Sequence, residues 1–143
     1  MTTTTQVRAE HRYKAAPEKV FDAFFDVNLA KKFMFATPTG EMVRAEIDPR
    51  VGGRFVFVDR RPEHGDVEHV GTWLEIERPR RLVFEFAVPQ YDQTKTKTTI
   101  TIEIVPDGEG SRLTLAHDGV FEEYVKQTEQ GWGMILENLE TVL

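Results

Sequence analysis

EEYVKQTEQGWGMILENLETVL, residues 122–143, decides how the rest of the chain can fold. One stripe of side chains in it, mostly apolar, recurs at steps of three and four residues, which is the period of a helical face. The side chains on this stripe are Val125, Thr128, Trp132, Ile135, Leu139 and Val142. A helix of this length covers about 33 Å. Because an apolar helical face needs a partner in water, we expect a sheet formed upstream to cover it.

Trp132 lies between Gly131 and Gly133. Each glycine costs about 1 kcal/mol against alanine inside a helix, so we interpret the pair as a close approach of the backbone to another element, or as the true start of the helix. Trp132 then has two competing roles, as a packing anchor or as the wall of a cavity between helix and sheet. We expect a modest pocket beside it.

The bulk composition indicates a single globular domain. The chain has 143 residues, 40% of them hydrophobic and 29% charged, with a formal net charge of −6 and no cysteine. The negative charge argues against nucleic acid and anionic lipid as partners. No apolar run is long enough to span a bilayer, so no membrane insertion is expected. We therefore predict a cytoplasmic domain over residues 7–143, after a disordered, threonine-rich tail formed by residues 1–6.

Two short helices and about six to seven strands precede the long helix. Pro17 suits the first position of a helix over residues 17–25, and a second helix is expected at residues 29–33. Period-two alternation predicts strands at residues 7–13, 42–47, 54–59, 68–77, 82–88, 96–105 and 111–117. Short connections favour an antiparallel meander. The sequence therefore predicts an α+β fold in which a curved sheet grips the C-terminal helix.

Five segments, in this order, resemble the family of activator-of-Hsp90-ATPase homologues, within the START/Bet v 1-like (SRPBCC) superfamily. They are APEKVFDAF (16–24), VGGRF (51–55), VGTWLEIERPRRLVFEF (70–86), SRLTLAHDG (111–119) and GWGMILENLETVL (131–143). The resemblance covers nearly the whole chain. It implies a helix-grip fold with a cavity between the sheet and the long helix.

Relatives in this superfamily use the cavity for lipids, sterols, polyketides and other apolar molecules, and some are cyclases or hydrolases. Small bacterial members of the family look like ligand binders. We expect no counterpart of the separate N-terminal domain of the Hsp90 co-activator for which the family is named. Contact with Hsp90 is therefore implied by the family name alone.

A cluster of imidazole and carboxylate groups near residue 65 has the chemistry to bind zinc or iron. Its members are Glu63, His64, Asp66, Glu68 and His69. Pro62 and Gly65 place His64 and Asp66 at a hairpin tip, in a turn over residues 60–67, where metal ligands would lack supporting hydrogen bonds. We interpret it as a solvated hairpin, and expect neither a metal nor a cofactor.

Four further side chains carry groups with acid–base chemistry: His117, His11, Glu75 and Glu85. His117 has the chemistry of a general base at the cavity mouth, but we favour a hydrogen-bonding role at the strand-to-helix turn. His11 is expected to be a packed histidine on the inward face of the first strand. Glu75 and Glu85 are expected at the surface, opposite an apolar row formed by Leu74, Ile76, Phe84 and Phe86. Trp73 shares the face of Glu75, and a β-bulge there would change which residues point inward.

Aromatic side chains are the candidate ligand contacts, because ten phenylalanines are many for this length. The candidates are Phe33, Phe35, Trp73, Phe84, Phe86, Tyr91, Phe121, Trp132 and Ile135. The favoured hypothesis is non-catalytic binding of a small apolar or amphipathic molecule. One alternative is a cyclase or hydrolase that uses an inward carboxylate or His117. Another is an interaction module for a chaperone or a different protein. A homodimer is compatible with all three.

Overall fold

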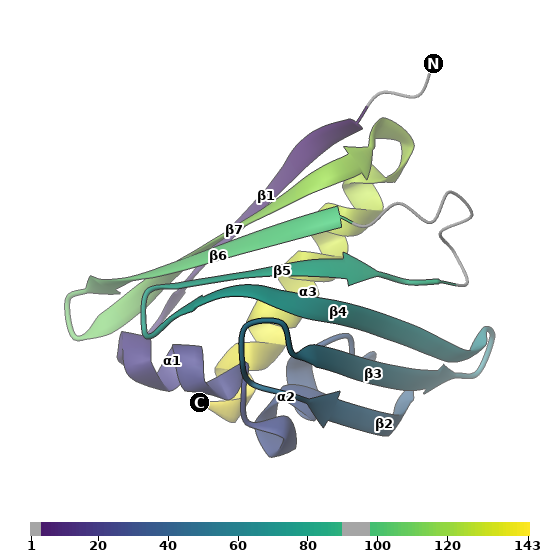
Figure 1. Cartoon of the computed structure of the whole chain (residues 1–143), viewed down its shortest axis with the longest axis horizontal. Coiled ribbons are helices and arrows are strands. Elements are labelled where there is room, and N and C mark those ends of the chain that lie inside the picture. The colour runs from purple at the N-terminus through teal and green to yellow at the C-terminus, as the bar shows by residue number, and fades with distance from the viewer. Residues whose placement is uncertain (1–3, 90–97) are drawn as a thin grey trace.

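The computed structural model describes residues 4–89 and 98–143, which form a seven-stranded antiparallel sheet around one long helix. In chain order the elements are β1 (Thr4–Tyr13), α1 (Pro17–Ala23), α2 (Val27–Phe33), β2 (Glu41–Ile47), β3 (Arg54–Arg61), β4 (Gly65–Glu77), β5 (Arg81–Ala87), β6 (Thr98–Asp107), β7 (Gly110–Phe121), the 3-10 helix η1 (Glu122–Tyr124) and α3 (Val125–Val142). The strand order is β1-β7-β6-β5-β4-β3-β2. Figure 1 shows the sheet curving around α3, with α1 and α2 near the C-terminal end of that helix. The predicted α+β helix-grip fold is confirmed.

The N-terminal strand begins earlier than expected. Thr4 pairs with Phe121 and Thr5 with Val120, so β7 extends β1 toward the N-terminus. The predicted disordered tail is therefore wrong for residues 4–6. The cause is that β7 runs on to Phe121, beyond its predicted end at His117, and supplies the partner that these threonines need.

Both short helices start where the local chemistry favours it. Pro17 occupies the first position of α1, where a missing N–H costs nothing. The Asp26 carboxylate accepts a hydrogen bond from the Asn28 N–H at 3.0 Å and caps α2. These two helices confirm the predicted pair, although α1 ends at Ala23.

The turn between β3 and β4 is shorter than the predicted 60–67 segment. It spans residues 62–64, and β4 begins at Gly65, which has a φ of 70°. Alternation from Gly65 turns Val67 and His69 toward the inner face, where both are buried. The interpretation of His69 as part of a solvated hairpin is therefore wrong, whereas His64 lies exposed in the turn as expected.

A β-bulge determines which side chains in the middle of β4 point toward the inner face. Trp73 lies opposite Phe84 and Glu75 lies opposite Val83, so Leu74 is the extra residue. Trp73 is buried, Glu75 is exposed and bonded to Arg81 at 2.9 Å, and Leu74 is exposed. The surface position of Glu75 is confirmed, but the inward position expected for Leu74 is wrong.

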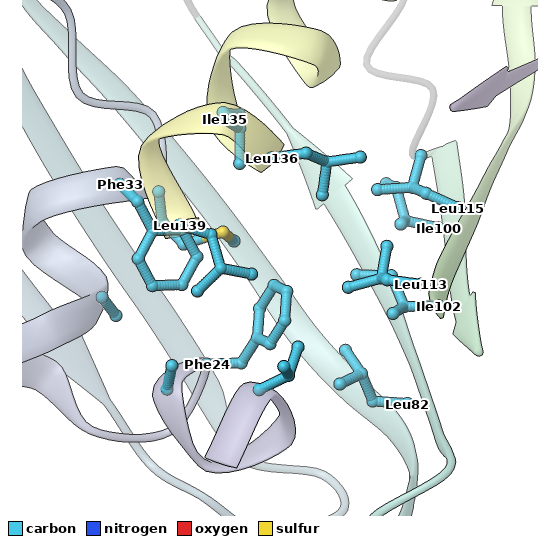
Figure 2. Close-up of a cluster of buried hydrophobic side chains, with 14 of the residues drawn as sticks. Phe24, Phe33, Leu82, Ile100, Ile102, Leu113, Leu115, Ile135, Leu136 and Leu139 are labelled. Atoms are coloured by element: carbon cyan, nitrogen blue, oxygen red, sulfur yellow. The ribbon is translucent and has the colours of Figure 1, made fainter. Parts of the chain in front are cut away.

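The main core lies between the sheet and the C-terminal half of α3. Figure 2 shows the side chains that meet there: Phe24, Phe33, Leu82, Ile100, Ile102, Leu113, Leu115, Ile135, Leu136 and Leu139. The Tyr13 hydroxyl of β1 donates a buried 2.7 Å hydrogen bond to the Leu136 carbonyl oxygen. This bond ties the middle of α3 to the sheet edge, so the position of the helix above the remaining strands is determined.

Candidate ligand-binding site

The side chains at the start of α3 are half-buried or exposed. Between residues 125 and 131, all of which the structure describes, no side chain is buried, and the buried stripe begins at Trp132. A Cβ added at Gly131 or Gly133 would meet no atom within 4 Å, and α3 starts well before both. Neither predicted reason for the two glycines therefore holds. Trp132 is the first helical side chain that reaches the inner face.

Phe35 fills the space between Trp132 and the sheet. It comes from the loop between α2 and β2, and its ring lies 4.4 Å from the ring of His69 and 4.9 Å from the ring of Phe86. The planes are within 10° of His69 and 2° of Phe86, so the rings stack. The Trp132 ring meets Phe35 edge-on at 6.0 Å. A loop residue thus occupies the centre of an aromatic cluster formed by Phe35, His69, Phe86 and Trp132.

His69 joins this cluster as a neutral ring. Its Nδ1 lies 3.3 Å from the Phe57 carbonyl oxygen, to which it donates a hydrogen bond from the opposite strand. Burial lowers the pKa of His69 to about 4, and the hydrogen bond to Phe57 only partly offsets this effect. His69 is therefore uncharged at neutral pH and suited to stacking.

His117 is held by a chain of hydrogen bonds that fixes its tautomer. The Trp132 Nε1–H donates to His117 Nδ1 at 2.9 Å, so that nitrogen carries no proton. The proton is on Nε2, which donates to the Thr98 hydroxyl oxygen at 2.7 Å, and this hydroxyl donates to the Phe86 carbonyl oxygen at 3.2 Å. Burial lowers the pKa of His117 to about 4, against the opposing effect of Asp118. The predicted hydrogen-bonding role is confirmed, with partners inside the fold rather than at a turn.

The loop that carries Phe35 is held by a buried carboxylate. Asp59 is 1% exposed, and its Oδ2 accepts hydrogen bonds from the Thr37 hydroxyl at 2.7 Å and from Arg61 Nε at 2.9 Å. The Arg61 guanidinium also donates to the Phe35 carbonyl oxygen at 3.4 Å. Among the described residues, Asp59 Oδ1 has no hydrogen-bond partner. One polar cluster therefore fixes the loop at the edge of the aromatic cluster.

The predicted ligand contacts separate into several groups. Phe35, Phe86 and Trp132 come together in the aromatic cluster. Trp73 and Phe84 pack on each other and on Phe55 farther along the inner face. The remaining candidates lie elsewhere: Phe33 packs on Phe24, Ile135 is in the main core, Phe121 is half-buried opposite Thr4, and Tyr91 lies outside the described residues. That any of them touches a ligand stays a prediction.

Sequence reasoning missed His69, Asp59 and the loop contacts that surround the cluster. The signal for Asp59 was present, because alternation along β3 places it on the same face as Phe55 and Phe57. The signal for His69 depended on the register of β4, which the bulge at Leu74 shifts. The pairing of Trp132 with His117 joins residues from a helix and a strand, and no local pattern reports it.

The imidazole and carboxylate groups near residue 65 differ in their surroundings. His64 is exposed in the turn between β3 and β4, whereas His69 is buried in β4. Across residues 4–89 and 98–143, no three histidine, aspartate or glutamate side chains gather as metal ligands would. The His11 ring packs on the Tyr13 ring with centroids 4.5 Å apart and planes tilted by 40°, and it lies 3.7 Å from the Glu140 carboxylate, so it is a packed edge histidine as expected.

Comparison with known proteins agrees with this geometry. The family model described as Activator of Hsp90 ATPase homolog 1-like protein matches residues 14–143. The chain belongs to this family. The resemblance seen in five sequence segments is thereby confirmed. No curated protein matches the chain.

Solved structures share the fold of this Hsp90-activator-homologue chain. A protein from Rhizobium loti is 26% identical, covers 100% of this chain and 99% of its own, and has a TM-score of 0.83. A protein of unknown function from Staphylococcus aureus is 18% identical over 99% and 94%, with a TM-score of 0.85. A protein from Nitrosomonas europaea is 24% identical over 96% and 93%, with a TM-score of 0.79. These likenesses support the fold and leave the ligand to be derived from the site.

Two hollows lie on the described surface of this family member. One, of about 640 Å³, is lined by Val43, Arg44, Val58, Asp66, Glu68 and Pro89, and a second, of about 350 Å³, is lined by Arg54, Val70, Gly71, Thr72, Glu85, Phe86 and Ala87. Neither is bounded by α3. The pocket expected beside Trp132 stays a prediction, and the space next to that ring holds Phe35. Among the described helices, none has the length and apolarity needed to cross a membrane.

Proposed function

We propose that this protein binds a small apolar or amphipathic molecule between the inner face of the sheet and α3, without catalysing a reaction on it. The observation that carries the proposal is the aromatic cluster between Trp132 and the inner face of the sheet. Its rings come from β4, β5 and α3, and the Phe35 side chain of a loop lies among them. An apolar wall with a few fixed polar groups is typical of small-molecule sites.

The buried histidines are the observation that favours a catalytic alternative. His69 and His117 flank Phe86, with ring centres 6.1 Å and 6.0 Å from its ring. A general base works best when its pKa lies near the operating pH. Both histidines have a pKa of about 4, and both nitrogens of His117 are committed to hydrogen bonds. Non-catalytic binding therefore accounts better for these groups.

Titration with N-phenyl-1-naphthylamine, an uncharged dye that brightens in apolar surroundings, tests the proposal. We expect saturable binding that weakens at least about tenfold in Trp132→Ala, because this ring supplies a wall of the site. Met134→Ala is the matched control, since Met134 is an exposed residue of the same helix. Trp132→Ala should also lose about 3–5 kcal/mol of stability, so urea unfolding must accompany the titration. Absence of saturable binding by any apolar probe would refute the proposal.

Native mass spectrometry of the freshly purified protein provides a second test. A bound molecule carried through purification would appear as a mass above that of the chain. The same mass should disappear after mild organic extraction, and its fragmentation would identify the chemical class.

A further inference from the structure

Phe35 is a core residue whose ring neighbours are aromatic. It belongs to a loop, yet its ring contacts the rings of His69, Phe86 and Trp132 and is 6% exposed. Most core side chains of this fold come from the sheet or the helices, and their positions follow from those elements. Phe35 reaches the site only through the conformation of the loop between α2 and β2.

The backbone at Phe35 is strained. Its φ is 60°, and within residues 4–89 and 98–143 it is the one non-glycine residue in the left-handed region. A bulky side chain rarely adopts this conformation, because its Cβ crowds the backbone. Such outliers persist where surrounding contacts hold them, and they concentrate at ligand clamps and switches. The ring stack and the polar cluster supply those contacts here.

The polar cluster formed by Asp59, Thr37 and Arg61 holds the loop by hydrogen bonds. Thr37 and Arg61 both use Oδ2 of Asp59, and Arg61 also holds the Phe35 carbonyl oxygen. The hydrogen bonds of Thr37 and of the Phe35 carbonyl oxygen join the loop to β3, and the Asp59–Arg61 bond within β3 supports them. Movement of the loop would break the Thr37–Asp59 and Arg61–Phe35 hydrogen bonds together. We call this pair of hydrogen bonds the latch.

We propose that Phe35 is a removable plug and that the site binds a planar aromatic molecule, which takes the place of the Phe35 ring against His69 and Phe86 while the loop moves outward. This inference rests on the proposed function and specifies its ligand. The planes of Phe35, His69 and Phe86 lie within 11° of one another, so what replaces Phe35 must be flat to recover the same contacts. A puckered or branched apolar molecule would lose the stacking with both rings.

Binding of 2-naphthol and of its saturated counterpart, decahydro-2-naphthol, tests the ligand class. The two compounds share a carbon skeleton and a hydroxyl group, and they differ in flatness. We expect the wild-type protein to bind 2-naphthol about tenfold more tightly, the effect of stacking on two rings. Equal affinities would overturn the planar-ligand inference and leave the proposed function intact. If neither compound nor the naphthylamine dye binds, both proposals fail.

Three substitutions test the plug. Phe35→Ala removes the competing ring and should raise the affinity for 2-naphthol several-fold, whereas Phe25→Ala, which deletes an equal ring that packs on Phe21, should not. Thr37→Val keeps the plug but removes a latch bond, and should raise the affinity while speeding hydrogen exchange at residues 35–40. Reduced affinity in Phe35→Ala would show that Phe35 is a wall and overturn the proposal. If Phe35→Ala fails to fold, Thr37→Val decides: unchanged affinity and exchange overturn the plug.

Discussion

Trp132 and Trp73, the two tryptophans of the chain, are both buried and differ in one hydrogen bond. Trp132 Nε1 donates to His117, whereas Trp73 Nε1 has no partner among the described residues. We expect Trp132→Phe to lower the free energy of unfolding by about 1–3 kcal/mol more than Trp73→Phe, because it leaves His117 Nδ1 buried without a donor. Urea unfolding, followed by the remaining tryptophan, measures both. Equal losses would show that the Trp132 bond contributes nothing beyond packing.

At the residue scale, the sequence predicted which side chains face inward better than it predicted which residues they contact. Alternation and helical period placed Phe86 and Trp132 on inward faces, because these patterns depend on neighbours along the chain. The role of Phe35 depends on a left-handed backbone conformation that phenylalanine does not favour, so no propensity rule predicts it. His69 was misplaced because alternation back from Leu74 and Ile76 does not allow for the bulge between Trp73 and Glu75.

At the scale of the element, the bulge in β4 is a feature that a deletion can test. Without Leu74, Trp73 would still point inward and Glu75 outward, in ordinary alternation. We therefore expect deletion of Leu74 to cost about 1–2 kcal/mol through altered strand twist. Deletion of Thr72 instead moves Trp73 to the outer face and brings Leu74 into its place, at a cost of at least about 3 kcal/mol.

Urea unfolding and Trp73 emission, measured in a Trp132→Phe background, distinguish these two deletions. Emission should stay blue-shifted without Leu74 and shift to the red without Thr72. If both deletions destabilise equally, the bulge itself holds the strand. The sequence raised such a bulge as an alternative but did not locate it, because apolar residues at 73, 74 and 76 satisfy two registers.

Among the elements, the long helix was predicted most completely and interpreted least well. Its period fixed the buried residues from Trp132 onward. Val125 and Thr128 belong to the same stripe but are only half-buried. Periodicity reports which residues share a face, not how deeply a partner buries each of them.

At the scale of the whole molecule, the layers that build the fold also build the site. The Tyr13 hydrogen bond ties α3 to β1. On the other side, the Phe35 ring of the α2–β2 loop lies between Trp132 of α3 and the rings of β4 and β5. One side of the sheet–helix space is therefore closed by fixed elements and the other by a loop. The fold class followed from the sequence because it depends on the order and period of elements. The site did not, because it depends on which loop enters that space.

Stability should fall as the pH is lowered from about 6.5 to about 4. The folded protein holds the pKa of His69 and His117 at about 4, against an ordinary value of 6.5. Between pH 6.5 and 4 the two histidines bind protons in the unfolded chain but not in the folded chain. Each histidine then costs up to about 1.4 kcal/mol per pH unit, or roughly 3 kcal/mol over the window. Above pH 6.5 both are neutral in either state, and their contribution is fully present.

Urea unfolding at intervals from pH 4 to 8 measures this dependence, and substitutions assign it. His117→Gln should remove about half of the decline, whereas His64→Gln, at an exposed turn position, should leave it unchanged. Arg78 lowers the pKa of Asp22 from 3.8, so loss of that ion pair belongs to more acidic conditions and does not overlap. Protonated His117 would also present Nδ1–H to the Trp132 N–H, which breaks their hydrogen bond. A shift of Trp132 emission should therefore accompany the loss of stability, and a flat stability profile between pH 4 and 6.5 would show that neither histidine is buried as described.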